Sequence, residues 1–213
     1  MHIKPKVLRS LSASVALALL AAAPARGQNN APFTVTLSPA TTAVHWTLNS
    51  TLHIVHGTFK LESGEIRIDP ATGDAAGLIV IDAASGESGD SARDRRMHGS
   101  IIESGSFPQI TYRPTHVSGH IDLTAGSDIT VDGTFHLHGS DHPLQMAIHL
   151  APGAKLTTHF AVPFVAWGLK DPSTFVFRTD KKVAIDIDAA YVATPEHSPA
   201  KAILKPGEVH TAQ

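Results

Sequence analysis

The sequence predicts an all-β domain of antiparallel strands that form a sandwich or a barrel. In many short segments apolar and polar residues alternate with a period of two, as expected for strands with one buried face and one wet face. A closed barrel is favoured because closure removes the exposed strand edges through which β-proteins aggregate. Turn-forming residues separate the segments, at ESG from Glu62, DPATG from Asp69, AGSD from Ala125, GSDHP from Gly139, and the pair Pro152 and Gly153.

The alternation places the expected strands along the chain from residue 44 to residue 187. In the first strand Val44, Trp46 and Leu48 alternate with His45 and Thr47. Side chains two residues apart share one face of a strand, so the apolar members form the predicted inner face. In the later strands those members are Phe59 and Leu61; Ile66 and Ile68; Val131, Phe135 and Leu137; Leu144, Met146, Ile148 and Leu150; Phe160, Val162 and Phe164; and Val183, Ile185 and Ile187.

One segment, from Ser91 to Ile102, lacks the period of two and predicts a short helix between strands. It reads SARDRRMHGSII and is rich in helix-forming residues. Met97, Ile101 and Ile102 fall on one side of such a helix. We therefore expect a helical crossover that turns one apolar side toward the domain.

The first 27 residues have the features of a secretory signal peptide. Residues 4–9 carry basic side chains, an apolar stretch runs from Leu11 to Ala23, and small residues precede a possible cut after Gly27. The apolar stretch is shorter than the ~20 residues that a membrane span needs. We expect a periplasmic or secreted protein with no transmembrane segment after cleavage.

The remaining chain divides into a domain at residues 33–192 and a flexible tail at residues 193–213, which contains several prolines. Loss of the signal peptide removes four basic residues and no acid, so the formal net charge changes from −2 to −6. A negative net charge does not favour binding to nucleic acid or to anionic membrane surfaces.

The chain has no cysteine. It therefore has neither disulfides nor a lipidated-cysteine anchor.

The chain has fourteen histidines, whose imidazole nitrogens could bind zinc or copper. His136 and His138 share one face of the strand that ends at Leu137, with His142 beyond the turn. Since Phe135 and Leu137 take the apolar face, the two histidines are predicted to point into solvent, where they titrate instead of binding a metal. The chain also lacks a G-x-S-x-G nucleophile elbow, a catalytic cysteine and a phosphate-binding glycine loop. We predict no catalytic residues, no metal site and no cofactor.

The densest charge cluster is Arg93, Asp94, Arg95 and Arg96, at the start of the expected helix. One interpretation is a solvated helical turn with a local Arg–Asp ion pair. The other is a cationic mouth for an anionic head group, because guanidinium matches the geometry of phosphate. The second interpretation makes Arg93 and Arg96 the candidate head-group residues.

Four motifs, in this order and spacing, resemble the YceI family of periplasmic, lipocalin-like polyisoprenoid-binding proteins. They are Gly57 to Phe59, Arg93 and Asp94 with Met97 after them, Phe107 with Pro108, and Gly133 to Gly139 with Pro143 after them. The resemblance covers about residues 33–189. It implies an eight-stranded antiparallel lipocalin-like barrel with a short helix, and an apolar tunnel for an isoprenoid lipid such as a polyprenyl phosphate or a quinone.

In that tunnel, large apolar side chains are the expected lipid contacts. Gly133 is expected to leave space beside Phe135, and the stretch from Trp167 to Asp171, which departs from the family pattern, is expected to shape the tunnel end. We predict an exported, non-enzymatic lipid-binding protein. The alternative is a filled barrel that responds to stress or binds a partner, and a homodimer stays open. The candidate lipid-binding residues are Trp46, Phe59, Phe107, Phe135, Met146, Phe160, Phe164 and Trp167.

Overall fold

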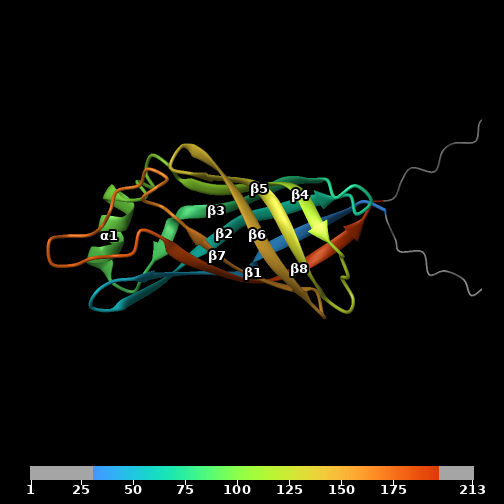
Figure 1. The fold of residues 1–213 in the computed structure, drawn as a ribbon, viewed down its shortest axis with the longest axis horizontal. Helices are drawn as coiled ribbons and strands as arrows, with labels where there is room; N and C mark the ends of the chain where they lie inside the picture. Colours follow the sequence, from blue (N-terminus) through green and yellow to red (C-terminus); the bar gives the residue numbers. More distant parts are fainter. Residues whose placement is uncertain (1–30, 197–213) are drawn as a thin grey trace, which may run out of the picture.

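The computed structural model describes residues 31–196, which form one closed barrel of eight antiparallel strands with a short helix at one end (Figure 1). Each strand pairs with the next, and the last pairs with the first. This architecture confirms the predicted fold class. The elements are β1 (Phe33–Asn49), β2 (Ile54–Ile68), β3 (Ala75–Glu87), α1 (Ser91–Ser100), β4 (Gln109–Gly119), β5 (Ser127–Leu137), β6 (Ser140–Ala151), β7 (Lys155–Val162) and β8 (Val183–Pro195).

The expected signal peptide, residues 1–27, and most of the expected tail lie outside the described residues. Strand β8 includes the first three residues of that tail, because it continues to Pro195. Glu196 follows and binds the Arg67 guanidinium of β2 at 2.8 Å.

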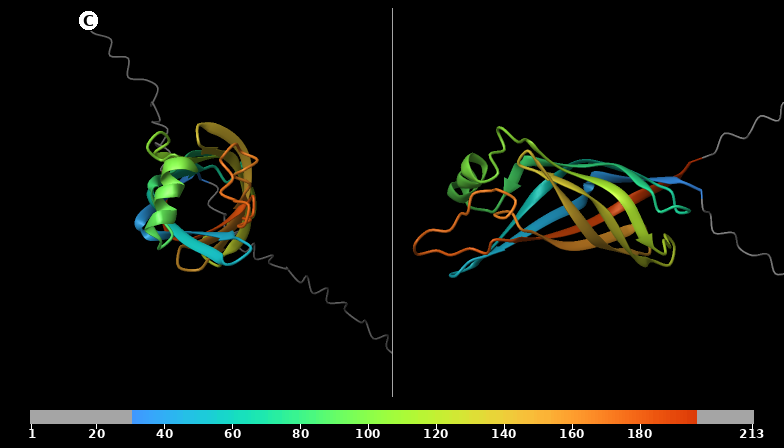
Figure 2. Two further views of the ribbon diagram at one scale, coloured as in Figure 1. Left: turned by 90° about the vertical axis from the view of Figure 1, so that its left-hand side faces the viewer. Right: turned by 45° about the horizontal axis from the view of Figure 1, so that its top comes forward.

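The barrel is elongated because its first strands are long. Strand β1 has 17 residues, which span roughly 55 Å at the ~3.3 Å rise of a strand residue. Helix α1 lies at one end, and the described chain begins and ends at the other (Figures 1 and 2). The left view of Figure 2 looks along the barrel from the α1 end. The two ends therefore differ: loops and the helix cover one, and the chain termini leave from the other.

Two predicted turns are placed wrongly. Strand β2 runs through Glu62 and Gly64 without turning, and a register shift between Leu61 and Ser63 marks a bulge against β3. Serine and glycine inside a strand are typical of a bulge, which accommodates an extra residue without ending the strand.

The second misplaced turn lies between β5 and β6. The turn contains only His138 and Gly139, with φ angles of 51° and 76°. Two positive φ values are typical of the two-residue type I′ hairpin. The residues from Ser140 onward belong to β6, and His138 lies in the turn, not on the solvent face of β5.

The interior contains two groups of buried side chains. The larger group fills the barrel over Leu37, Tyr112, Val131, Met146 and Tyr191. The smaller group lies toward α1 and includes Ile102, Leu137, Val162 and Phe164. Packing is therefore divided between the two halves of the barrel.

Gly133 does not leave empty space beside Phe135, contrary to the sequence-based expectation. A Cβ atom at Gly133 would come within 2.6 Å of Tyr112 Cζ and 2.5 Å of the Arg113 carbonyl oxygen. The Tyr112 ring thus occupies the position above the glycine. Its hydroxyl donates to the carbonyl oxygens of Val131 at 3.1 Å and Leu144 at 3.2 Å. Burial raises the pKa of Tyr112, so the hydroxyl keeps its proton at neutral pH.

Replacing Tyr112 by Phe should lower the free energy of unfolding by about 1 kcal/mol, because the carbonyl oxygens of Val131 and Leu144 lose the hydroxyl donor that they share. Tyr191→Phe is the matched control. The Tyr191 hydroxyl is buried without a hydrogen-bond partner among the described residues, so its removal should leave stability unchanged or raise it. Urea unfolding of both variants measures the difference. Equal losses would show that the Tyr112 hydrogen bonds do not stabilise the filled half.

Candidate functional site

The candidate site is an apolar cavity of about 310 Å³ in the α1 half of the barrel. Strands β1, β2, β4, β5, β7 and β8 contribute to its wall, together with α1 and the connection between β7 and β8, residues 163–182. None of the buried side chains of the filled half lines it. The apolar wall is formed by buried or half-buried side chains, which include Trp46, Val55, Ile102, Ile110, Leu137, Val162, Phe164, Leu169, Val183 and Ile185.

Trp46 forms one wall because a glycine lies opposite it. Trp46 of β1 pairs directly with Gly57 of β2. A Cβ atom at Gly57 would approach Trp46 Cε2 to 2.2 Å and the Glu87 carbonyl oxygen to 2.2 Å. The indole therefore lies flat on the strand with 6% of its surface exposed, and its Nε1 is buried without an acceptor in the described part of the chain. This contact gives Gly57, in the Gly57–Phe59 motif, a structural role.

Helix α1 forms another wall and begins at an Asp cap. The Asp90 carboxylate accepts hydrogen bonds from the backbone N–H groups of Ala92 and Arg93, both at 2.9 Å. These backbone donors lower the pKa of Asp90. Met97, Ile101 and Ile102 line the cavity, as expected for one apolar side of this segment, although the helix ends at Ser100 and the last two residues follow it.

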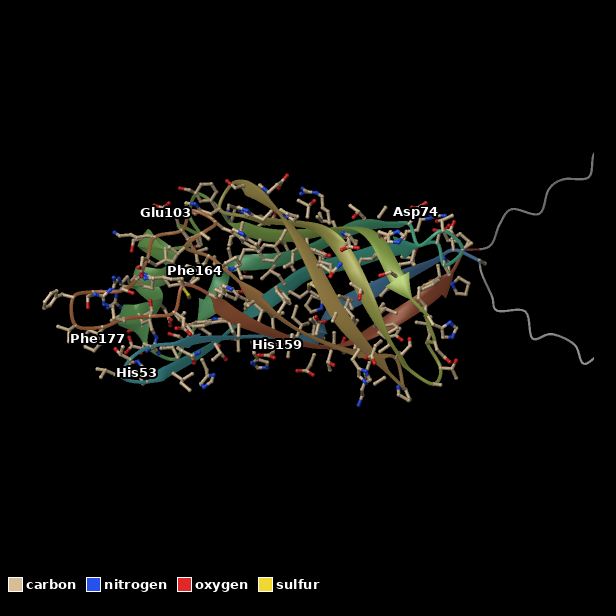
Figure 3. The ribbon with its side chains drawn as sticks, viewed as in Figure 1. His53, Asp74, Glu103, His159, Phe164 and Phe177 are labelled. Carbon is tan, nitrogen blue, oxygen red and sulfur yellow. The ribbon has the colours of Figure 1, made fainter. Side chains whose placement is uncertain are left out.

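Arg93 and Arg96 of α1 line the cavity together with His53 and Phe177, which are exposed, and we call this part of the cavity its mouth. Figure 3 labels His53 and Phe177 at the α1 end of the barrel. Arg93 donates through Nε to Ser88 Oγ at 2.7 Å and through Nη2 to the Ser88 carbonyl at 2.8 Å. Arg96 donates through Nη2 to the carbonyl oxygen of Pro172 at 3.0 Å. Within residues 31–196 neither guanidinium pairs with a carboxylate. The local Arg–Asp ion pair considered from sequence is therefore not formed, and both cations line an apolar cavity.

The connection between β7 and β8 closes one side of the cavity. Leu169 from this segment is buried against the cavity, and its N–H donates to the Phe164 carbonyl at 3.0 Å. Lys181 binds the Asp171 carboxylate and lowers the pKa of that carboxyl to about 2. The pair ties the end of the connection to its middle at neutral pH.

The eight residues predicted from the sequence to contact lipid lie in different parts of the structure. Those on the cavity wall are Trp46, Phe59, Phe135 and Phe164. Two others pack directly against Phe135: Phe160 edge-to-face, with ring centroids 6.4 Å apart, and Trp167, with centroids 5.6 Å apart. Trp167 also stacks on His142 at 4.2 Å. Four of these six side chains therefore line the cavity, and the other two pack against one of the four.

The other two lie elsewhere. Met146 belongs to the filled half. Phe107 precedes β4 and lies against His138, with ring centroids 4.1 Å apart, and against the turn at Gly139. Alternation assigned Met146 to the correct face but could not show its depth along the barrel axis. All eight remain predictions as ligand contacts.

Sequence reasoning missed the contribution of the β7–β8 connection beyond Asp171. Pro172, Thr174, Phe177 and Thr179 all line the cavity. A signal was present in the sequence: Phe175 to Phe177 is an apolar triplet in a segment without strand alternation. Such a run is unusual in a solvated loop and indicates a contact surface.

In the described part of the chain, four histidines each pair with a single carboxylate. His136 binds Asp141 at 2.6 Å, and His159 binds Asp186 at 2.6 Å. His138 Nε2 binds Glu103 at 2.7 Å. Over the described range no three His, Asp or Glu side chains group as a metal site. In the same range no helix is long and apolar enough to cross a membrane.

Gly57→Ala should displace the Trp46 indole from the cavity wall. The added methyl group meets both the ring and a backbone carbonyl, so we expect a loss at the upper end of the ~1–3 kcal/mol typical of overpacking. Gly99→Ala in α1 is the control, because a Cβ there meets nothing within 4 Å. Thermal melts and Trp46 emission, recorded in a Trp167→Phe background, report the change. An unaltered emission spectrum would contradict the assigned indole position.

Comparisons with known proteins identify the same kind of fold. The family model described as a YceI-like domain matches residues 35–191. No curated protein sequence matches the chain. The structure of BcnA from Burkholderia cenocepacia is similar with a TM-score of 0.59 and 18% identity, over 71% of this chain and 97% of that chain.

Two further solved structures are similar. A polyisoprenoid binding domain from Saccharophagus degradans has a TM-score of 0.52 and 17% identity, over 76% of this chain and 98% of that chain. The YCEI protein of Campylobacter jejuni has a TM-score of 0.51 and 16% identity, over 70% of this chain and 88% of that chain. At these identities the likeness concerns the fold.

Proposed function

The chain belongs to the YceI family, and on that basis we propose that it is an exported, non-enzymatic protein that holds an amphiphilic isoprenoid lipid in its barrel. The observation that carries the proposal is the open apolar cavity with two arginines at its mouth. The Saccharophagus degradans neighbour, described as a polyisoprenoid binding domain, adds support for the class of ligand. Residues 1–27, read as a signal peptide, support a periplasmic or secreted location.

The apolar wall of the cavity suits an isoprenoid tail. Its side chains are branched aliphatic or aromatic, and transfer of apolar surface out of water contributes about 25 cal/mol per Å². The volume of about 310 Å³ is at the lower end of the ~300–1,000 Å³ range of ligand sites. A short tail, or one end of a longer chain, occupies this space, and the remainder of a long chain leaves through the mouth.

The mouth suits a polar or anionic head group. Arg93 is positioned by its two bonds to Ser88, and Arg96 by its bond to Pro172. Each guanidinium has five N–H donors in a planar fork, so donors remain for a ligand. A phosphate would take a charge-assisted contact, and the carbonyl groups of a quinone would accept neutral hydrogen bonds. We favour a prenyl phosphate because two cations approach the mouth.

A filled barrel that binds a partner is the competing function. It would not require an empty apolar space, because side chains could fill the α1 half as they fill the other half. The cavity therefore favours the lipid-binding proposal.

The proposal is tested by native mass spectrometry of the protein, expressed with its first 27 residues and purified without detergent. We expect a bound lipid of isoprenoid mass, or uptake of added farnesyl phosphate by empty protein. Val162→Trp and Ile102→Trp fill the cavity and should abolish uptake. Val192→Trp, at a site on β8 that is 63% exposed, is the control and should retain it. Repeated recovery of empty wild-type protein that takes up no prenyl ligand would refute the proposal.

Phe135→Ala should affect ligand retention more than stability. Phe135 is half-buried and lines the cavity, so its removal should cost less than the ~3–5 kcal/mol of a packed core phenylalanine. His136→Ala is the neighbouring control. It removes an exposed pair with Asp141, worth at most about 1 kcal/mol, and should leave retention intact. Thermal melts and lipid recovery check both variants. A core-sized loss for Phe135→Ala, with no lipid in the parent, would favour a filled barrel.

A further inference from the structure

Exposed apolar side chains are concentrated at the α1 end of the barrel, which we call the open end because the cavity opens there. Seven large apolar residues are exposed in the described part of the chain, and five lie in or directly next to the two loop tips beside the cavity mouth. We call these five the apolar rim: Leu52, Ile54, Phe175, Val176 and Phe177. The remaining two, Leu78 and Val192, lie on β3 and β8. Figure 3 labels Phe177 and His53 at this end, on two loops that project past the barrel.

Backbone hydrogen bonds hold the two tips together. The N–H of Thr51 donates to the Arg178 carbonyl at 2.9 Å, and the N–H of Asp180 donates to the Asn49 carbonyl at 2.9 Å. Between them Ser50 and Thr179 form a β-bridge. The rim is therefore one surface built by two segments that are distant in the sequence.

A tight turn presents the most exposed apolar residue of the rim to solvent. The N–H of Thr174 donates to the Phe177 carbonyl at 2.7 Å, and the N–H of Phe177 donates to Thr174 Oγ1 at 3.1 Å. Phe175 and Val176 occupy the tip of this turn, and Phe175 is 98% exposed. Exposure of a whole phenylalanine in water is unfavourable and marks an interaction surface.

Charge is unevenly distributed, although the chain is acidic overall. Residues 90–100 and residues 163–182, which include three of the rim residues, together hold seven Lys or Arg residues and four Asp residues. The rest of the described range holds four Lys or Arg residues and fourteen carboxylates. The expectation that the acidic chain avoids anionic surfaces therefore does not apply to this end.

We propose that the open end docks on the surface of a phospholipid bilayer that contains anionic lipids. The apolar rim enters the interface between head groups and acyl chains, and the surrounding cations contact the lipid head groups. This combination of protruding apolar residues with basic neighbours is the chemistry of peripheral membrane binding. A second copy of the chain is a less suitable partner for the apolar rim, because the two basic ends would repel each other.

Docking would join the cavity to the bilayer. Phe177 belongs to the rim and also lines the cavity, next to the mouth residues Arg96 and His53. An apolar path therefore runs from the inserted tips into the barrel, so that a lipid tail could pass between bilayer and cavity without crossing water. Docking itself requires no ligand in the cavity and does not rest on the lipid-binding proposal.

The test is flotation of the protein with unilamellar vesicles. One set contains phosphatidylcholine alone and the other contains phosphatidylcholine with phosphatidylglycerol. The wild type should float with the mixed vesicles, and added salt should weaken its binding. Combined Phe175→Ser and Val176→Ser should lower the partition coefficient at least about tenfold, because two apolar side chains no longer leave water. Val192→Ser, which removes an exposed apolar residue from the barrel side, is the control and should bind as wild type.

Charge is tested with Arg95→Gln and Arg178→Gln, which lie outside the cavity wall. Each should weaken binding to the mixed vesicles about fivefold. Wild-type protein that stays unbound with both vesicle sets would overturn the proposal, as would wild-type binding by the Phe175→Ser, Val176→Ser protein. That protein should still take up farnesyl phosphate from solution, so loss of docking and loss of ligand binding are distinguished by separate readouts.

Discussion

The pairing of β8 with β1 closes the sheet, and the other features of the molecule depend on this closure. The two strands are in register from Phe33 opposite Pro195 to Thr47 opposite Ala184, with one shift between Leu37 and Thr42. A barrel of eight strands encloses an interior that is just wide enough to be filled by side chains or to hold one small ligand. Here both solutions occur in one barrel. Side chains fill the half next to the chain termini, and the α1 half retains a cavity of about 310 Å³.

Aromatic rings packed over glycines determine how each half is occupied. Tyr112 covers Gly133 in the filled half, and Trp46 covers Gly57 on the cavity wall. Phe59 likewise packs over Gly86, where a Cβ atom would be 2.4 Å from Phe59 Cε1. In each case the missing side chain lets a large ring lie flat against the sheet. Rigid rings therefore form much of the cavity wall. The fold itself leaves the cavity open, because these rings lie against the sheet and do not extend into the space between them.

Much of the fold was predictable from local sequence, but the site was predictable only in part. Period-two alternation identified the strands, and its loss after Ser91 identified α1. Alternation distinguishes the inner from the outer face, yet it carries no information on depth along the axis, so Met146 was grouped with cavity residues although it lies in the filled half. The strand through Glu62 was read as interrupted because a bulge uses the same residue types as a turn. The apolar rim arises from two loops joined by backbone bonds, and net charge concealed the basic character of that end.

The central claim is that the α1 half of the barrel holds the tail of an isoprenoid lipid. A crystal structure of the protein soaked with farnesyl phosphate tests this claim most directly. The account predicts continuous density that begins between Arg93 and Arg96 and extends toward Phe135 and Val162. A cavity closed by repacked side chains, or ligand density only outside the barrel, would contradict it.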